Sequence, residues 1–178
     1  VLDQSKKKRI IVDKSFGDGD GINSRILAVD YGTLVLDSVQ TICDQIRKAF
    51  VSGREIVFIM EDVTAYYRNL PVQARDCPHQ LIVYPDGVIV IDFCENVGGR
   101  GAPFKSGYLG DVICWIMQQP PYSIESPFHY SDNFFAVSTV ANMDRERDSF
   151  KRVFADLNLP LNDKDSKMGK EFNLIGFD

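Results

Sequence analysis

The sequence predicts an α+β fold, and three observations support that class. Short apolar runs typical of strands alternate with segments in which apolar residues recur every three or four positions, as in helices. From residue 55 onward the predicted order is strand, hairpin, helix, strand–turn–strand, helix and strand. The chain has 178 residues, 44% of them hydrophobic, and is long enough to bury a core without disulfides. We therefore expect two helices packed against one face of an antiparallel sheet.

The N-terminal part predicts one short strand and one helix. Residues 9–12 (RIIV) are mostly β-branched and favour a strand, and residues 15–24 form a loop rich in Gly and Asp. Asp37 and Ser38 are good N-cap residues for a helix whose apolar positions follow at helical spacing. That helix is expected to end at Gly53.

The central part predicts a buried strand and a hairpin. Residues 56–60 (IVFIM) are a continuous apolar run that suits a strand buried on both faces, and Glu61 and Asp62 follow directly. Residues 81–84 and 88–93 flank the sequence Pro-Asp-Gly, which is typical of a tight β-turn.

The C-terminal part predicts two helices separated by strands. Residues 102–119 favour a helix whose apolar residues, Trp115 included, are expected in the core; Phe104, Tyr108, Val112 and Ile116 step by four. Residues 134–137 should form a strand after a tight turn at Asp132-Asn133, and residues 172–177 a final strand. The second helix carries an apolar stripe of Met143, Phe150, Val153, Phe154 and Leu157.

Composition and charge exclude several classes of protein. The formal net charge of −5 and the pI near 5.0 argue against a protein that holds nucleic acid by charge alone. No apolar run approaches the ~20 residues of a membrane span, and the basic N-terminus lacks the apolar segment of a signal peptide. The four cysteines are widely spaced, which disfavours a zinc site and favours reduced thiols. We expect an intracellular protein without a membrane partner, in the cytoplasm or nucleus, with an organelle left open.

Two aspartates lie where the predicted strands end or turn. Asp62 follows the apolar strand, and Asp132 lies between His129-Tyr130 and Phe134-Phe135. A carboxylate beside apolar surface is costly unless it is paired or binds a cation, and oxygen ligands on adjacent strands suit Mg²⁺. The alternative is that both are ordinary turn residues that face water.

Six segments, taken in order, carry a family resemblance. They are residues 9–13 (RIIVD) with Asn23, residues 61–72 (EDVTAYYRNLPV), 97–103 (VGGRGAP), 130–133 (YSDN), 159–167 (LPLNDKDSK) and 172–178 (FNLIGFD). Together they resemble the motifs of the fingers and palm of reverse transcriptases, which are RNA-directed DNA polymerases, and are most similar to those of retrotransposons and other retroelements. The resemblance implies a polymerase palm, a ferredoxin-like antiparallel sheet backed by helices, with part of the fingers.

The resemblance also implies a domain division. Residues 1–54 would be a partial fingers subdomain and residues 55–178 the palm, within one reverse-transcriptase-like domain. The chain ends where a thumb would begin and has no RNase H segment. It is therefore expected to be a piece of a polyprotein, a subunit of a larger complex, or a reduced domain.

The site residues implied by the resemblance fall into two groups. Asp62, Asp132 and Asn133 would be catalytic and would hold two Mg²⁺ (or Mn²⁺) ions for nucleotidyl transfer. The partners would be deoxynucleoside triphosphates and an RNA or DNA template with its primer. Residues at positions that contact these substrates are Lys8, Arg9, Tyr67, Gly98, Gly99, Arg100 and Lys164, with Lys167 as an alternative to Lys164. Each of these has an ordinary structural alternative, such as a surface charge, a core aromatic or a simple loop.

Four departures from the family pattern bear on activity: Asn133, Val97, Ala65 with Tyr66, and a chain that ends where a thumb would begin. Asn133 replaces a second aspartate and removes one unit of ligand charge; at an effective dielectric of ~20 and ~4 Å each charge pair is worth roughly 4 kcal/mol. Tyr66 replaces a small residue and is expected to crowd the nucleotide pocket. The alternative function is therefore a degenerate, non-catalytic palm that serves as a scaffold in a ribonucleoprotein or another assembly.

Overall fold

The computed structural model describes residues 14–15, 19, 21–34, 37, 39–164 and 166–170. The strands expected at residues 9–12 and 172–177 lie outside these residues. The chain divides into two compact units, residues 1–32 with 67–103 and residues 33–66 with 104–178. The expected boundary lies between residues 54 and 55. In this division the chain instead enters the second unit at residue 33, returns to the first at residue 67 and re-enters the second at residue 104.

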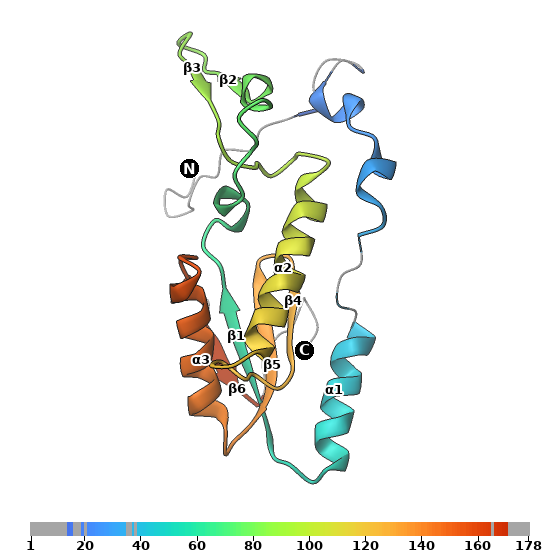
Figure 1. The fold of residues 1–178 in the computed structure, drawn as a ribbon, viewed down its shortest axis with the longest axis vertical. Coiled ribbons are helices and arrows are strands. Elements are labelled where there is room, and N and C mark those ends of the chain that lie inside the picture. Colours follow the sequence, from blue (N-terminus) through green and yellow to red (C-terminus); the bar gives the residue numbers. More distant parts are fainter. Residues whose placement is uncertain are drawn as a thin grey trace, which may run out of the picture. The chain divides into compact units, whose positions relative to one another are not determined.

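The element order is that of an α+β protein, as predicted. Three α-helices and six strands occur among the described residues (Figure 1): α1 (Val39–Val51), β1 (Ile56–Asp62), β2 (Leu81–Val83), β3 (Ile89–Ile91), α2 (Ala102–Gln118), β4 (Pro127–Tyr130), β5 (Asn133–Thr139), α3 (Met143–Asp156) and β6 (Lys167–Gly169). Gly53 ends α1 as expected, with a left-handed φ of 68° that favours glycine. Strand β6 was not predicted.

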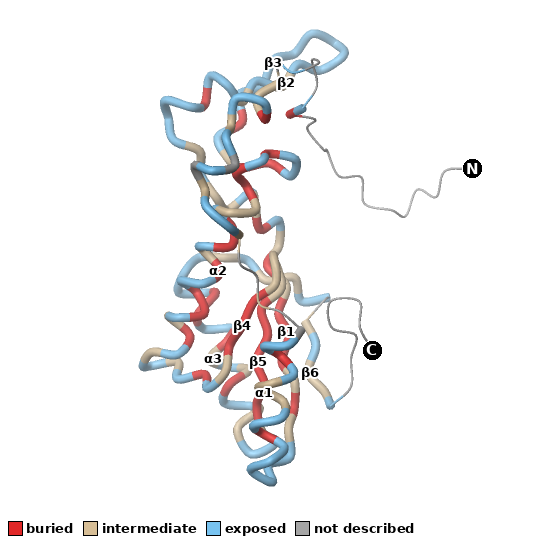
Figure 2. The backbone as a smooth tube through the Cα atoms, turned by 90° about the vertical axis from the view of Figure 1, so that its right-hand side faces the viewer, coloured by how far each residue is buried: buried red, intermediate tan, exposed pale blue. Residues whose placement is uncertain are grey.

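The second unit is built on a four-stranded antiparallel sheet in the order β4-β5-β1-β6. Strand β1 is interior and pairs with β5 along its whole length, from Ile56 opposite Thr139 to Asp62 opposite Asn133. Burial on both faces explains why residues 56–60 form a continuous apolar run rather than an alternating one. Figure 2 shows that β1, β4 and β5 are largely buried.

Helices cover both faces of this sheet, whereas the sequence predicted helices on one face. Odd-numbered residues of β1, such as Ile59, pack in a cluster with Ile113 of α2 and Phe154 of α3. Even-numbered residues, such as Met60, pack with Ile42 of α1 in a second cluster. The amphipathic helix α1 therefore closes the face opposite α2 and α3.

The buried face of α2 differs from the predicted stripe. Tyr108, Val112 and Trp115 are exposed, Trp115 by 62%. The buried face instead consists mainly of small residues together with three larger ones: Ala102, Ser106, Gly107, Gly110, Ile113, Cys114 and Met117. Small residues let the backbone approach its neighbours closely, which a search for large apolar residues does not detect.

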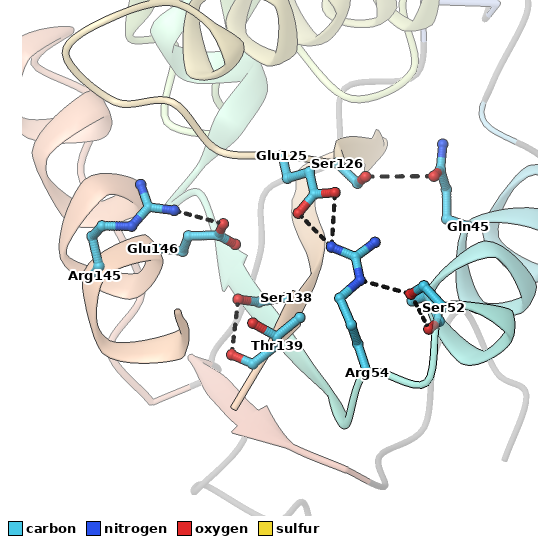
Figure 3. Close-up of polar contacts among 10 residues, drawn as sticks. Gln45, Ser52, Arg54, Glu125, Ser126, Ser138, Thr139, Arg145 and Glu146 are labelled. Carbon is cyan, nitrogen blue, oxygen red and sulfur yellow. Dashed lines mark hydrogen bonds and ion pairs between the residues drawn. The ribbon is translucent and has the colours of Figure 1, made fainter. Parts of the chain in front are cut away.

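Polar contacts tie the loops of the second unit to its strands (Figure 3). Arg54, which follows α1, donates to both carboxylate oxygens of Glu125 at 3.0 Å, just before β4. Ser126 donates to Gln45 of α1 at 3.4 Å. These contacts connect α1 to the edge strand, although the exposed ion pair contributes little stability by itself.

The first unit has less regular structure. It contains short 3-10 helices at Ile22–Arg25, Ala28–Tyr31 and Cys77–His79, and the hairpin of β2 and β3. The hairpin pairs Leu81 with Ile91 and Val83 with Ile89, and all four side chains are exposed. The tight turn predicted at Pro-Asp-Gly is confirmed, with Gly87 at a φ of 84°.

Candidate functional site

Asp62, Asp132 and Asn133 come together at one end of the four-stranded sheet. Asp62 is the last residue of β1, and Asn133, directly opposite it, is the first residue of β5. The carbonyl oxygen of Asp132 accepts the Val63 N–H at 3.0 Å, so the turn is joined to the end of β1. All three residues are half-buried. The pairing of β1 with β5 therefore unites two acidic residues that are seventy positions apart.

The turn lies one residue earlier than predicted. Tyr130 pairs with Asn133, so Ser131 and Asp132 are the two central residues, and Asn133 belongs to the strand. Ser131 has a φ of 57°, a left-handed value that hairpin turns of types I′ and II′ require at this position. A serine in this conformation stores strain directly before Asp132, as is common at functional sites.

Each aspartate accepts a hydrogen bond from an asparagine amide. Asn133 Nδ2 donates to Asp132 Oδ1 at 3.3 Å, and Asn162 Nδ2 donates to Asp62 Oδ2 at 3.1 Å. Sequence reasoning did not single out Asn162. The only available signal was its place in the LPLN segment, which the resemblance had already marked.

The chain around Asn162 is fastened to the end of β1 by backbone contacts. The Asn162 N–H donates to the Asp62 carbonyl at 2.8 Å, and the Thr64 N–H donates to the Pro160 carbonyl at 2.8 Å. Val63 and Leu161 form an antiparallel bridge between these two bonds. The segment therefore extends the sheet locally and holds the side chain of Asn162 beside Asp62.

The donor set fits a hard divalent cation. Two carboxylates supply charge, and Asn133 can supply an amide oxygen once its side-chain amide rotates. Oxygen ligands of this kind suit Mg²⁺ or Mn²⁺. No cluster of three or more His, Cys, Asp or Glu side chains with metal-binding geometry occurs in the part of the chain that is described. Among the described residues, strand pairing brings two acidic residues, Asp62 and Asp132, to this end of the sheet.

A third acidic residue near this site faces the other way. Glu61 is buried, with 1% exposure, on the face of β1 that α2 and α3 cover. Burial raises the pKa of Glu61, although Ser166 and the cations Lys151 and Arg147 oppose that rise. Alternation along the strand separates Glu61 from Asp62, so Glu61 does not join the donor set.

Tyr66 does not crowd the site, contrary to the expectation from sequence. Its side chain is 2% exposed, its hydroxyl donates to the Ser106 carbonyl at 2.9 Å, and its ring meets Phe134 edge-on at 5.9 Å. Tyr66 is therefore part of the core. Tyr67, expected to select deoxyribose, is half-buried in the first unit, in a 3-10 helix that spans Tyr66–Asn69.

The glycine-rich loop, residues 97–101, is organised by Asn23 within the first unit. Asn23 Oδ1 accepts the Arg100 backbone N–H at 2.8 Å, and Asn23 Nδ2 donates to the Gly98 carbonyl at 2.8 Å. Gly98 has a φ of 107°, and a side chain at Gly101 would lie 2.6 Å from the Tyr31 hydroxyl. Gly98 is required by its left-handed backbone conformation, and Gly101 is required because there is no room for a side chain.

A partly buried polar network supports the same loop. Lys14 is 6% exposed and donates to Gln80 at 2.8 Å, and a Cβ at Gly99 would lie 3.3 Å from the Lys14 amine. Asn96 joins Gln80 at 3.4 Å, and Arg68 donates to Asn96 at 2.9 Å. Gln80, Asn96 and Arg68 were not singled out from the sequence, because each belongs to a residue type that is usually exposed.

The network ends in an ion pair that fixes the charge of both partners. Arg68 donates to Asp92 at 2.5 Å. Burial alone would raise the pKa of Asp92, but the hydrogen bonds from Arg68, Asn96 and the Cys94 N–H outweigh it and lower that pKa. The same hydrogen bond raises the pKa of Arg68. This pair stabilises the first unit rather than offering a reactive group.

The remaining predicted residues are not brought together by any described contact. Lys8 and Arg9 lie outside the described residues. Arg100 is exposed in the first unit and donates to the Ile26 carbonyl at 2.9 Å. Lys164 is exposed in the second unit, two residues beyond Asn162.

Comparison with known proteins does not assign a family. A scan against protein-family models matched none, and a search of curated proteins found no match. In the described part of the chain, no helix combines the length and the apolar character that crossing a membrane requires.

Proposed function

We propose that this chain is the fingers–palm part of a reverse transcriptase that adds deoxynucleotides to a primer on an RNA or DNA template. The observation that carries the proposal is the convergence of Asp62, at the end of β1, and Asp132, in the β4–β5 turn, at one end of an antiparallel sheet. The six motifs of the sequence, in their order, support it. The glycine-rich loop, held by Asn23, would support the nascent base pair.

In this proposal Asp62, Asp132 and Asn133 hold two Mg²⁺ or Mn²⁺ ions. Such ions activate the primer hydroxyl and stabilise the charge on the leaving pyrophosphate. The protein's own contribution is strand pairing, which brings the backbones of the two acidic residues to the same end of the sheet. Tyr67 would select deoxyribose, and Lys8, Arg9, Arg100 and Lys164 would neutralise the triphosphate and template.

Incorporation of a labelled deoxynucleotide on a primed RNA template tests the proposal. We expect incorporation with Mg²⁺ or Mn²⁺ by the purified chain, and a loss of at least ~100-fold in Asp62→Ala and Asp132→Ala, as for removal of a principal electrostatic group. Asp144→Asn, an exposed residue of α3, is the control and should retain activity. Absence of incorporation with both cations, and of any Asp62-dependent Mn²⁺ binding, would contradict the proposal.

A second candidate is a non-catalytic palm that acts as a scaffold for RNA or for other subunits. Asn133 at the position of a second acid, with its amide N–H turned toward Asp132, favours this alternative. The scaffold predicts that affinity for a primer–template duplex is unchanged in Asp62→Ala and Asp132→Ala while no nucleotide is added. The polymerase predicts that incorporation depends on both residues.

A further inference from the structure

We infer that Asn162 is a positioning residue that orients the carboxylate of Asp62 for a divalent cation. The inference rests on the proposed function, since it concerns the same site. Three contacts support it: the Asn162 Nδ2–Asp62 Oδ2 hydrogen bond at 3.1 Å, the backbone bond of Asn162 to the Asp62 carbonyl at 2.8 Å, and the adjoining bridge of Leu161 to Val63.

The carboxylate needs such a partner because its own torsion is soft. The last torsion of an aspartate side chain has a broad, two-fold energy profile, so strand pairing fixes the Cα of Asp62 but not its oxygens. An N–H donor that the backbone holds in place contacts one particular carboxylate oxygen and so fixes the orientation of the carboxylate plane. Because the backbone of Asn162 is itself paired with β1, the donor is delivered by sheet geometry rather than by a flexible loop.

The chemistry of the donor also matters. A lysine or arginine at this place would form an ion pair with Asp62 and compete with a cation for its charge. A neutral amide orients the carboxylate and leaves its full charge for the cation. Partners that orient a ligand in this way typically contribute 10- to 100-fold to metal affinity.

Lys164 and Asp163 follow Asn162 in the same segment and are both exposed. The charge of the segment and the contact of Asn162 can therefore be varied separately. Asp163→Asn removes one negative charge beside Asn162 without removing the amide, and therefore serves as a matched control.

Mn²⁺ binding to the full chain, followed by electron paramagnetic resonance, tests the inference without relying on activity. We expect Asn162→Ala and the similarly shaped Asn162→Leu to weaken Mn²⁺ affinity by about 10-fold or more. Asn162→Gln, which keeps an amide donor, should recover part of the loss, and Asp163→Asn should stay within about twofold of the wild type. Thermal unfolding of each variant checks that the fold is retained.

The outcomes separate this inference from the proposed function. Wild-type affinity in Asn162→Ala, or an equal loss in Asp163→Asn, would overturn the positioning role and leave the proposed function standing. Both would be overturned if the wild-type chain bound no Mn²⁺, or if Asp62→Asn left its Mn²⁺ binding unchanged. In the cation-free protein, the side-chain amide protons of Asn162 should shift in the ¹H–¹⁵N spectrum of Asp62→Asn; unchanged resonances would refute the contact itself.

Discussion

Gly110 determines how closely α2 approaches the strand that leads to Asp132. A Cβ at this position would lie 2.3 to 2.6 Å from three atoms of the His129 ring, which is buried and also packs against Phe134. His129 Nε2 lies 3.1 Å from Asp111 Oδ1, on the residue after Gly110. The glycine therefore makes room for a histidine that connects α2 to β4.

Replacement of Gly110 by alanine should destabilise the protein by about 1–3 kcal/mol, the usual cost of overpacking a core. Gly107→Ala is the matched control, because its Cβ would meet only the end of the Leu34 side chain, at 2.8 Å. Alanine is favoured over glycine in a helix by about 1 kcal/mol, and this gain should offset most of the cost of the contact with the Leu34 side chain. Urea denaturation measures both, and equal losses would contradict the packing argument.

Glu146 links stability to pH at the residue scale. It is 1% exposed on α3; its Oε1 accepts from Arg145 at 3.1 Å, and Oε2 has no hydrogen-bond partner among the described residues. Burial raises the pKa of Glu146 above its ordinary value of 4.5, and Ser138 and Arg145 oppose this only in part. The folded state therefore binds this proton more tightly than the unfolded state does.

The free energy of unfolding should therefore include a favourable contribution from Glu146 that is full below pH 4.5 and is lost as the pH rises through the raised pKa. We expect Glu146→Gln to gain stability relative to the wild type as the pH increases across that window. Urea titrations at a series of pH values test this. Asp144→Asn, at an exposed position in the same turn of α3, controls for the loss of one negative charge from the helix.

At the scale of elements, the β4–β5 turn stores strain at Ser131. Glycine adopts a φ of 57° without steric cost, whereas a β-branched residue there is disfavoured. We expect Ser131→Gly to stabilise the protein by up to ~1 kcal/mol and Ser131→Val to destabilise it by ~1–2 kcal/mol. Thermal unfolding of the two variants should shift in opposite directions; shifts of the same sign would show that the turn is not strained.

Helix α2 presents Trp115 to solvent, although the sequence predicted it in the core. Because the chain has one tryptophan, its fluorescence reports on this single position. At 62% exposure, its emission should already be red-shifted in the native state, be readily quenched by acrylamide, and change little on unfolding. A blue-shifted, protected emission would contradict the exposed position.

The sequence predicted the elements better than the faces they bury. The strand before Asp62, the hairpin around Gly87 and the three helices were found from apolar runs, caps and turn residues. The orientation of α2 was not, because glycine and serine define its buried face. The same limitation hid the role of Asn162, since a polar residue gains its role from partners distant in the chain, which periodicity does not describe.

At the scale of the whole molecule, the second unit is assembled from two separate stretches of chain, residues 33–66 and 104–178. The hydroxyl of Tyr66 donates to the carbonyl of Ser106 at 2.9 Å. The two stretches of the second unit therefore lie close together near the points where the chain leaves this unit and comes back to it. Both core clusters described above lie within this unit. It therefore has the burial that independent folding requires.

Replacement of residues 67–103 by a short Gly/Ser linker should yield a chain that unfolds cooperatively in urea and retains the circular dichroism of an α+β protein. Phe154→Ala removes a fully buried side chain. When it is added to the excised chain, the free energy of unfolding should fall by ~3–5 kcal/mol relative to the excised chain alone. A non-cooperative transition in the excised chain would show that the two units depend on each other.

The pairing of β1 with β5 also has a kinetic consequence. Asp62 meets the Asp132 turn only after a long loop has closed, and Asn162 reaches Asp62 across 100 residues of sequence. Contacts between positions so far apart form slowly, because the entropy of loop closure opposes them until the sheet is nearly complete. Cation affinity during refolding would then rise with the last cooperative phase, and a nascent chain that extends past Asp132 but not to Asn162 would carry both aspartates without a finished site.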